Sequence, residues 1–495
     1  MYFLGIDVGT SAVKVTVLNA ETRQVVQTAQ YPETEAEIIA HQPGWAEQDP
    51  EQWWIFTQKA IQKAHVGQKY RPDEIKAIGI AYQMHGLVLV NQDQKVLRNA
   101  IIWCDSRAVA IGEKAFQDLG EQYCLNSLLN SPGNFTAAKL AWVKQNEPHI
   151  YKQIHKVMLP GDFIAMKLSG EITTSISALS EGIFWDFKKN QLSAEVLNYF
   201  GFAQEHFPEI KPVFSEHGRL KADKAQELQL SPHIPITYKS GDQPNNALSL
   251  NVTRPGEVAA TAGTSGVIYG VSDQLVHDSQ SRVNTFAHVN YDPQQIRTGI
   301  LLCINGTGSL NSWTKKVMGG PLSYSEMNTQ AAQVPIGSQG ISVLPFGNGA
   351  ERMLNNKQIG AQIYGLDFNQ HSQAHLFRAM QEGIAFAFRY GLDIMRENGM
   401  HPAVIKAGKA NLFLSQVFAE AFVGATGVPV ALSDNNASLG AALGAGIGNR
   451  FYSTADEAFS SSCQQQIIEP KNTQQYEDSY QQWKAILQES LNQHQ

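Results

Sequence analysis

The feature of this sequence that most constrains its fold is a Gly-Thr-Ser tripeptide that stands twice between two β-prone segments. Gly9-Thr10-Ser11 interrupts the alternating residues 2–18, and Gly263-Thr264-Ser265 interrupts residues 257–269 in the same way. A matching hairpin late in the chain indicates two related halves, which we divide into residues 1–246 and 247–495. A chain of 495 residues is also too long for one ordinary hydrophobic core, so two large domains are expected.

Strand-like segments alternate with helical ones along the rest of the chain. A helix is predicted to begin after Asp49, which would cap it, with Pro50 at its first position. The small residues of 437–447 indicate a helix that packs closely against a neighbour. The last segment is predicted to be an amphipathic helix, whose apolar face consists of Tyr476, Tyr480, Trp483, Leu487 and Leu491. This mixture of elements predicts an α/β, or mixed α+β, fold.

The composition excludes several classes of protein. A formal net charge of −7 argues against nucleic acid or an anionic membrane as the main partner. Cys104, Cys124, Cys303 and Cys463 have no paired spacing, which is typical of reduced thiols in a cytoplasmic protein. The N-terminus lacks a basic region, and no stretch approaches the ~20 apolar residues of a membrane span. We therefore expect a cytoplasmic protein. A homodimer is the commonest closed assembly, but the sequence does not settle the oligomeric state.

Both Gly-Thr-Ser turns have the composition of a phosphate-binding loop. Glycine lets a phosphate group approach the backbone, and consecutive N–H groups form a nest for an anion. A single such turn is more often a plain hairpin, because Gly, Thr and Ser are ordinary turn residues. Two copies in matching settings favour the phosphate interpretation, since two hairpins that face each other would clamp a triphosphate chain.

Asp7 lies in an otherwise apolar strand, just before the first turn. A carboxylate in such a place is costly unless it is paired or serves an ion. We favour a role as a Mg²⁺ ligand through water, because Mg²⁺ keeps several of its waters in protein sites. The alternative is a carboxylate that accepts hydrogen bonds from the N–H groups of the turn.

Asp242 follows a predicted strand at residues 235–238 and lies in a Gly-Asp-Gln-Pro-Asn-Asn turn. Phosphoryl transfer requires positioning, cation screening and a group that orients or deprotonates the acceptor hydroxyl. Asp242 is our candidate for this group. The alternative, an aspartate that caps a turn or helix, is common and equally consistent with the local pattern.

Two further strand ends carry polar residues. Gln83 and His85 after the strand at 77–80 would suit a ligand with many hydroxyl groups, although a lone histidine is often structural. Asp105 and Arg107 after the strand near 100–103 would add sugar contacts, or would pair with each other in a solvated turn.

Common nucleotide and metal motifs are absent from the sequence. Gly408-Lys409 lacks the spaced glycine and the Ser or Thr of a Walker A loop. Asn305-Gly306-Thr307-Gly308 does not fit the dinucleotide fingerprint, and its glycines favour turns and helix packing. The sequence contains neither an HExxH motif nor a Cys/His set with the spacing of metal ligands.

At this point the chain resembles the FGGY family of carbohydrate kinases. The motifs that carry the resemblance are Leu4-Gly5-Ile6-Asp7-Val8-Gly9-Thr10-Ser11 with Lys14, Gly44-Trp45-Ala46-Glu47-Gln48-Asp49-Pro50, Gln83-Met84-His85-Gly86, Ile102-Trp103-Cys104-Asp105-Ser106-Arg107, Leu159-Pro160-Gly161-Asp162-Phe163 and Phe346-Gly347-Asn348-Gly349-Ala350-Glu351-Arg352. They occur along the whole chain in the same order as in the family. Gln83-Met84-His85-Gly86 is most similar to the sugar-facing motif of the xylulokinases.

The resemblance implies a two-domain actin/hexokinase/Hsp70-like (ribonuclease H-like) ATPase fold with a central cleft. It implies transfer of the γ-phosphoryl group of ATP, with Mg²⁺, to the terminal hydroxyl of a ketopentose, D-xylulose first. Asp242 would be the base and, with Asp7, would serve the metal. The substrate-binding residues would be Gln83, Met84, His85, Trp103, Asp105 and Asn245. The nucleotide-binding residues would be Gly9, Thr10, Ser11, Lys14, Gly263, Thr264, Ser265, Gly306, Gly408 and Lys409.

The chain departs from the pattern of the xylulokinases at two places. Those enzymes have Asn directly after the catalytic Asp, whereas Gln243-Pro244 intervenes here before Asn245. Their Gly-Gly-Gly-Ala segment is replaced by Ala407-Gly408-Lys409-Ala410. Kinases for ribulose, gluconate or glycerol therefore stay as alternatives, together with an ATP-binding chaperone-like protein or a sugar sensor without turnover.

Overall fold

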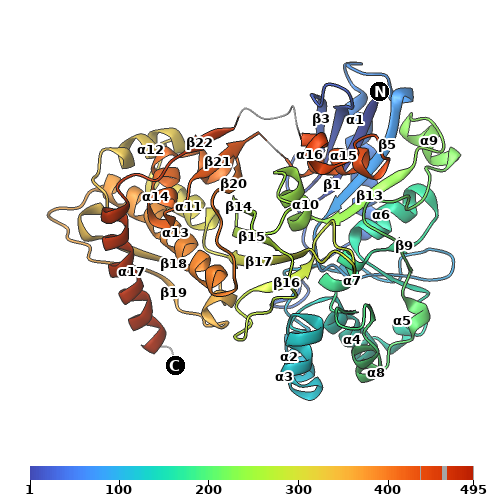
Figure 1. Ribbon diagram of the computed structural model, residues 1–495, viewed down its shortest axis with the longest axis horizontal. Helices are drawn as coiled ribbons and strands as arrows, with labels where there is room; N and C mark the ends of the chain where they lie inside the picture. The colour runs from blue at the N-terminus through green and yellow to red at the C-terminus, as the bar shows by residue number, and fades with distance from the viewer. Residues whose placement is uncertain (435, 460–464, 494–495) are drawn as a thin grey trace.

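Two large β-sheets organise the computed structural model, which describes residues 1–434, 436–459 and 465–493. The first sheet has the strand order β13-β5-β1-β2-β3. Its strands are β1 (Tyr2–Val8), β2 (Val13–Asn19), β3 (Val25–Tyr31), β5 (Ile75–Tyr82) and β13 (Ile236–Gly241). Figure 1 shows this sheet in the half of the molecule that contains the N-terminus.

The second sheet has the order β16-β17-β15-β14-β20-β21-β22 among the described residues. Its strands are β14 (Val258–Ala262), β15 (Gly266–Ser272), β16 (Asn284–Ala287), β17 (Thr298–Ile304), β20 (Ile405–Gly408), β21 (Val430–Ser433) and β22 (Gln466–Ile468). The figure places it in the other half, beside the C-terminal helices.

The two sheets share one topology. In the first, β1, β2 and β3 form an antiparallel meander, and β5 and β13 continue parallel to β1. In the second, β14, β15 and β17 form the meander, and β20 and β21 continue parallel to β14. Each predicted Gly-Thr-Ser turn joins the first two strands of its meander. The predicted mixed architecture of two ribonuclease H-like units is therefore confirmed.

The helix α1 (Pro50–His65) covers the first sheet against β2 and β3. It begins as predicted, because the side chain of Asp49 accepts a hydrogen bond from the Glu51 N–H and Pro50 stands in the first turn. On the opposite end of the chain, α17 (Thr473–Gln493) buries Tyr476, Tyr480 and Trp483 against the second half. The predicted amphipathic helix is thus present.

The predicted small-residue helix, α15 (Ala437–Gly448), packs on the first sheet and not on the second. Figure 1 shows it beside β1 and β5 of the first sheet, although its residues follow β21 of the second sheet in the sequence. A Cβ atom at Gly5 would overlap the carbonyl oxygen of Ser438, and one at Gly79 would overlap that of Ala441. A late segment therefore completes the N-terminal half. The division at residue 246 falls inside α10 (Asp242–Ser249) and stays a prediction.

Several shorter elements frame the site described below. They are α2 (Val109–Leu119), α4 (Thr136–Asn146), α7 (Ile176–Glu181), α8 (Ala194–Phe200), α11 (Gly308–Thr314), β18 (Ser342–Phe346), η6 (Arg352–Leu354) and β19 (Gly360–Tyr364). No helix in the described part of the chain is long and apolar enough to cross a membrane. Cys104, Cys124 and Cys303 are free thiols, and Cys463 lies outside the described residues.

Candidate active site

Three parallel strands of the first sheet bring the predicted catalytic residues to one edge. Val8 of β1 lies beside Tyr82 of β5, and Tyr82 lies beside Gly241 of β13. Asp7, the Gln83–His85 segment and Asp242 are therefore all at the carboxyl ends of adjacent strands, where ligands bind in open α/β sheets. The helix α10, which begins at Asp242, also contacts β14 and β15 of the second sheet. Asp242 consequently lies between the two halves.

Asp7 and Asp242 act on each other electrostatically. Burial raises the pKa of Asp242 to about 7, and the negative charge of Asp7 contributes to that rise, whereas hydrogen bonds from Gln243 oppose it. Burial also raises the pKa of Asp7 to about 6, against the charge of Lys14, its exposed cross-strand neighbour. The two negative charges repel each other. A cation bound between the carboxyl groups would offset this repulsion.

The described residues contain no group of three or more His, Cys, Asp or Glu side chains that could hold a metal ion. Asp7 and Asp242 alone still fit Mg²⁺, because that ion is commonly held by one or two carboxylates together with waters and substrate phosphates. Asp7 is partly exposed, so its carboxylate is accessible to a hydrated ion.

The first turn, Gly9–Ser11, is held by side chains. Thr10 donates its hydroxyl proton to Oε1 of Gln83 at 2.9 Å, and Nε1 of Trp103 donates to the Thr10 hydroxyl at 3.0 Å. Nε2 of Gln83 donates to Gln48, and Gln48 in turn donates to the Thr10 carbonyl at 2.8 Å. Gln83 is only 3 % exposed. Its amide therefore fixes the turn from a buried position.

Trp103, in contrast, is 49 % exposed beside Thr10 and is accessible to a ligand. Ser11 and Lys14 are exposed as well, whereas Gly9 and Thr10 are partly exposed. The four predicted nucleotide residues of the first turn thus lie together at the surface.

Met84 and His85 lie against the strand that leads to Asp242. A Cβ atom at Gly241 would be 2.6 Å from Cγ of Met84. Nδ1 of His85 is 3.1 Å from the carbonyl oxygen of Glu181, and its ring meets the rings of Phe135 and Phe286 at 4.8 and 5.4 Å. Burial, reinforced by the charge of Lys139, lowers the pKa of His85 to about 3, so the imidazole is neutral.

Asp105 does not face the site, which corrects the prediction of a sugar contact. The residue is fully buried, and its carboxylate accepts hydrogen bonds from the Ala46 N–H at 2.6 Å and from Nη2 of Arg107 at 2.7 Å. The pairing of Asp105 with Arg107 is the alternative that the sequence left open. It occurs inside the protein and not in a solvated turn, because Arg107 is itself covered and bound to Glu47.

The side chain of Asn245, predicted to bind the substrate, is instead bonded inside the protein. Its Nδ2 donates to the carbonyl oxygen of Ala437 at 2.8 Å, its Oδ1 accepts from the Tyr238 hydroxyl at 3.1 Å, and it is fully buried. Asn245 therefore ties α10 to the start of α15. The partly exposed residue next to the base is Gln243, which hydrogen-bonds to Asp242.

Three loops of the second half converge on the second turn. The Gly308 N–H donates to the Gly263 carbonyl at 2.9 Å, and the Ser309 N–H donates to the Thr264 carbonyl at 3.1 Å. A Cβ atom at Gly263 would be 3.6 Å from the side-chain amide of Asn411, in the loop after β20. Gly306, whose Cβ would overlap the Pro345 carbonyl, enters the same loop as Gly308.

The predicted nucleotide residues of this half are thereby brought together. Thr264 is exposed, Gly263 and Ser265 are partly exposed, and Gly408 lies at the end of β20 with Lys409 exposed beside it. Their roles in nucleotide binding stay predictions.

The structure adds polar residues that the sequence analysis missed. Glu181 of α7 is 2 % exposed and its Oε1 has no hydrogen-bond partner, while burial and the charge of Asp242 raise the pKa of Glu181 far above its usual range. Lys139 of α4 is fully buried and donates to the His85 carbonyl at 2.9 Å, and burial lowers its pKa to about 7. Both residues lie inside helices without any motif, so only their tertiary position marks them.

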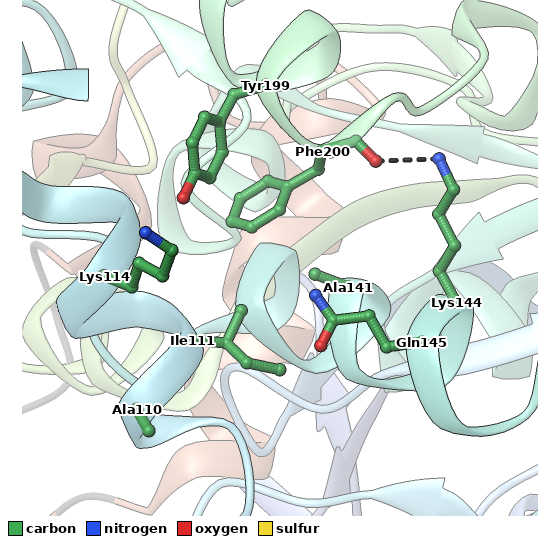
Figure 2. A pocket seen from close by; sticks show the side chains of 8 residues that line it. All are labelled: Ala110, Ile111, Lys114, Ala141, Lys144, Gln145, Tyr199 and Phe200. Atoms are coloured by element: carbon green, nitrogen blue, oxygen red, sulfur yellow. Dashed lines mark hydrogen bonds between the residues drawn. The ribbon is translucent and has the colours of Figure 1, made fainter. Parts of the chain in front are cut away.

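A cavity of about 600 Å³ lies elsewhere, between α2, α4 and α8. Figure 2 shows its lining, with Lys114 and Tyr199 on one side and Lys144 donating to the Phe200 carbonyl on the other. None of the predicted site residues lines it. The predicted catalytic residues therefore lie at the strand ends and not in this cavity.

Comparison with known proteins gives one family for the chain. Residues 2–249 match the N-terminal domain and residues 258–448 the C-terminal domain of the FGGY family of carbohydrate kinases. The chain is 30% identical to a xylulose kinase of Escherichia coli (strain K12) over 84% of each chain. A crystal structure described as a xyloylose kinase from Brucella ovis superimposes with a TM-score of 0.89 at 26% identity, covering 99% of both chains.

A gluconate kinase from Lactobacillus acidophilus has the same fold, with a TM-score of 0.89 at 20% identity over 100% of this chain and 99% of that one. The two-domain fold predicted from the sequence is thus shared along the whole chain.

Proposed function

The chain belongs to the FGGY family of carbohydrate kinases and phosphorylates a sugar with ATP, and we propose that its acceptor is D-xylulose, which becomes D-xylulose 5-phosphate. The observation that carries the proposal is the meeting of Asp7, Met84–His85 and Asp242 at adjacent strand ends. Support for the sugar comes from relatives named xylulose kinase, such as those of Escherichia coli and Bacillus subtilis.

Asp242 is the proposed general base. With a pKa of about 7, a substantial fraction of its carboxyl group is ionised at neutral pH and is basic enough to accept the proton of an acceptor hydroxyl. Gln243 hydrogen-bonds to it and would hold the carboxylate in one orientation. The hydroxyl oxygen that loses its proton is the one that attacks the γ-phosphorus atom.

Asp7, with Asp242, would hold Mg²⁺ through water at the carboxyl end of β1. When bound, the ion neutralises charge on the phosphate oxygens. Asp7 supplies the carboxylate for this purpose, and Lys14, on the neighbouring strand, adds a positive charge on the same side. The backbone N–H groups of Gly9–Ser11 and Gly263–Ser265 would bind phosphate oxygens as anion nests.

Met84, His85 and Trp103 would bind the sugar, and Gly408 and Lys409 would lie beside the adenosine. The neutral His85 offers its Nε2 as an acceptor to a sugar hydroxyl, because Nδ1 carries the ring proton and donates it to the Glu181 carbonyl. We further propose that the enzyme acts in the cytoplasm, where ATP is abundant. A homodimer remains a prediction.

The experiment that tests the proposed function is a coupled assay of ADP release with Mg-ATP against xylulose, ribulose, gluconate, glycerol, fructose and xylose. Turnover with D-xylulose at least tenfold above the other sugars is the expected result. Preference for another sugar would retain the kinase and overturn the proposed substrate. ATP cleavage that does not depend on any sugar would favour a chaperone-like protein.

A further inference from the structure

Arg352 stands at the start of η6, directly after Glu351, in the loop between β18 and β19. Glu351 is fully buried, and its two carboxylate oxygens accept the Asn305 N–H at 3.1 and 3.2 Å. Its own N–H donates to the Lys357 carbonyl at 3.2 Å. Glu351 thereby fixes the Arg352 backbone to the loop that carries Gly306 and Gly308. Arg352 is consequently anchored in the C-terminal half.

The guanidinium of Arg352 nevertheless reaches the sugar side of the N-terminal half. Its Cζ is 5.8 Å from the ring centre of Phe135, and the same ring meets His85 edge-on at 4.8 Å. A Cβ atom at Gly133 would be 3.4 Å from Nη2 of Arg352. The positive charge also contributes to the low pKa of His85 and opposes the rise in the pKa of Cys303. Arg352 therefore lies close to both residues.

Arg352 is not part of any ion pair between residues that the structure describes. Its one hydrogen bond is from Nη1 to the Ser281 carbonyl, and this bond is long at 3.4 Å. Arg107, on the same half as His85, shows the usual solution for a covered arginine, because it is paired with both Asp105 and Glu47. Arg352 is partly exposed and is paired with no anion among the described residues, so its remaining N–H donors are available to oxygen acceptors of a ligand.

We propose that Arg352 is a substrate-binding residue: it donates hydrogen bonds to the oxygens at the end of the sugar that lies against His85, opposite the hydroxyl at Asp242. The inference rests on the proposed function, in which that end of a ketose carries the carbonyl group. The ring of Phe135 contacts both Arg352 and His85, which places the guanidinium on the His85 side of the predicted sugar site. A residue of the C-terminal half would then recognise a sugar held by the N-terminal half.

The test compares Arg352→Met and Arg352→Lys with the wild type in steady-state kinetics. For Arg352→Met we expect the KM for D-xylulose to rise about 10- to 100-fold, because a donor to the substrate is lost. The KM for ATP is expected to stay within about twofold. Arg352→Lys keeps the charge without the planar fork and should recover only part of the affinity.

The matched control is Arg389→Lys, since Arg389 pairs with Asp393 of the helix α13 (Gln373–Glu397) and with Glu477 of α17, away from the site. Its kinetic constants should equal those of the wild type. A second readout is the preference for D-xylulose over D-arabinitol, which lacks the carbonyl. That preference should fall at least fivefold in Arg352→Met, and an unchanged preference overturns the placement at the carbonyl end.

Failure of this inference is distinguishable from failure of the proposed function. A wild type that phosphorylates D-xylulose, with an unchanged sugar KM in Arg352→Met, overturns the role of Arg352 alone. A parallel rise in both KM values with a lowered melting temperature indicates a structural role and also overturns it. If the wild type prefers gluconate, the proposed substrate is wrong, and a rise of the gluconate KM in Arg352→Met still supports Arg352. A wild type that neither phosphorylates nor binds any sugar overturns both proposals.

Discussion

The two Gly-Thr-Ser turns occupy equivalent places in two sheets of the same topology, yet their surroundings differ. Two residues before the first turn stands Asp7, whose carboxylate is partly exposed. Two residues before the second stands Thr261, whose hydroxyl accepts a hydrogen bond from the Asn246 amide at 2.9 Å. The same backbone unit therefore carries an ionisable group in one half and a neutral structural contact in the other.

The turns are also held differently. Side-chain amides and an indole fix the first turn, through Gln83, Gln48 and Trp103. Backbone N–H groups of Gly308 and Ser309 fix the second. From this difference we infer that the first half supplies the reacting groups and side-chain recognition, whereas the second half supplies a close-packed backbone surface. Changes of functional group should affect the first, and changes of bulk should affect the second.

The largest effect is expected at Asp242, the carboxyl group proposed as the base. Asp242→Asn removes the base and leaves the shape, so kcat should fall by roughly 10²–10⁴ while the KM for sugar changes little. Steady-state kinetics with D-xylulose at saturating ATP measures it, with circular dichroism as a check of folding. Near-normal turnover would remove Asp242 from the mechanism.

The pH dependence tests the same half without a mutation. Asp242 has a raised pKa of about 7, so its carboxylate form predominates above pH 7 and is lost as the pH falls. We expect log kcat to rise with slope about one up to pH 7 and to level off above it. Protonation of Asp7, with a pKa of about 6, should steepen the fall at lower pH. A profile that is flat between pH 5.5 and 8 would contradict the assignment.

A larger side chain at Gly308 should displace the second turn. A Cβ atom at Gly308 would overlap the Gly263 carbonyl oxygen, so Gly308→Ala must shift the loop against the turn. We expect the KM for ATP to rise roughly tenfold, with the KM for sugar within about twofold, since a small misplacement weakens positioned contacts. Equal effects on both substrates would show that the two halves do not divide their roles as we infer.

The smallest effect is expected at Gln83. Gln83→Leu removes the hydrogen bond to Thr10 and loosens the first turn, so the KM for ATP should rise about three- to tenfold. The KM for sugar should stay within about twofold, because the amide is buried and bonded to Thr10 and Gln48. Gln52→Leu on the exposed face of α1 is the control. A larger rise in the KM for sugar than in the KM for ATP would support the role of Gln83 in sugar binding that the sequence predicted.

Local patterns were sufficient for much of the fold. The two hairpins, the cap at Asp49 and the apolar face of α17 depend on residues close in sequence, and each is present. The sequence also singled out Asp7 and Asp242, because a carboxylate at the end of an apolar strand is unusual, and the structure places both at adjacent strand ends. The sequence motifs also led to the correct family.

Tertiary structure decided the partners of those side chains. Gln83 and Asp105 lie in the predicted loops, whereas Asn245 lies in the helix α10 and not in the predicted turn. Their polar atoms are taken by Thr10, Arg107 and Ala437, and no local pattern reveals this. Glu181, Lys139 and Arg352 came to the site from helices or from a distant loop.

By itself, then, the sequence determined the elements, the duplicated hairpin and the two carboxyl groups, because short-range sterics, hydrogen bonding and hydrophobic periodicity act between near neighbours. Only the tertiary structure decided that α15 completes the first sheet and that Arg352 reaches across to His85. Such contacts join residues hundreds of positions apart. Their geometry follows from how whole sheets and helices pack, and that packing is a property of the assembled chain.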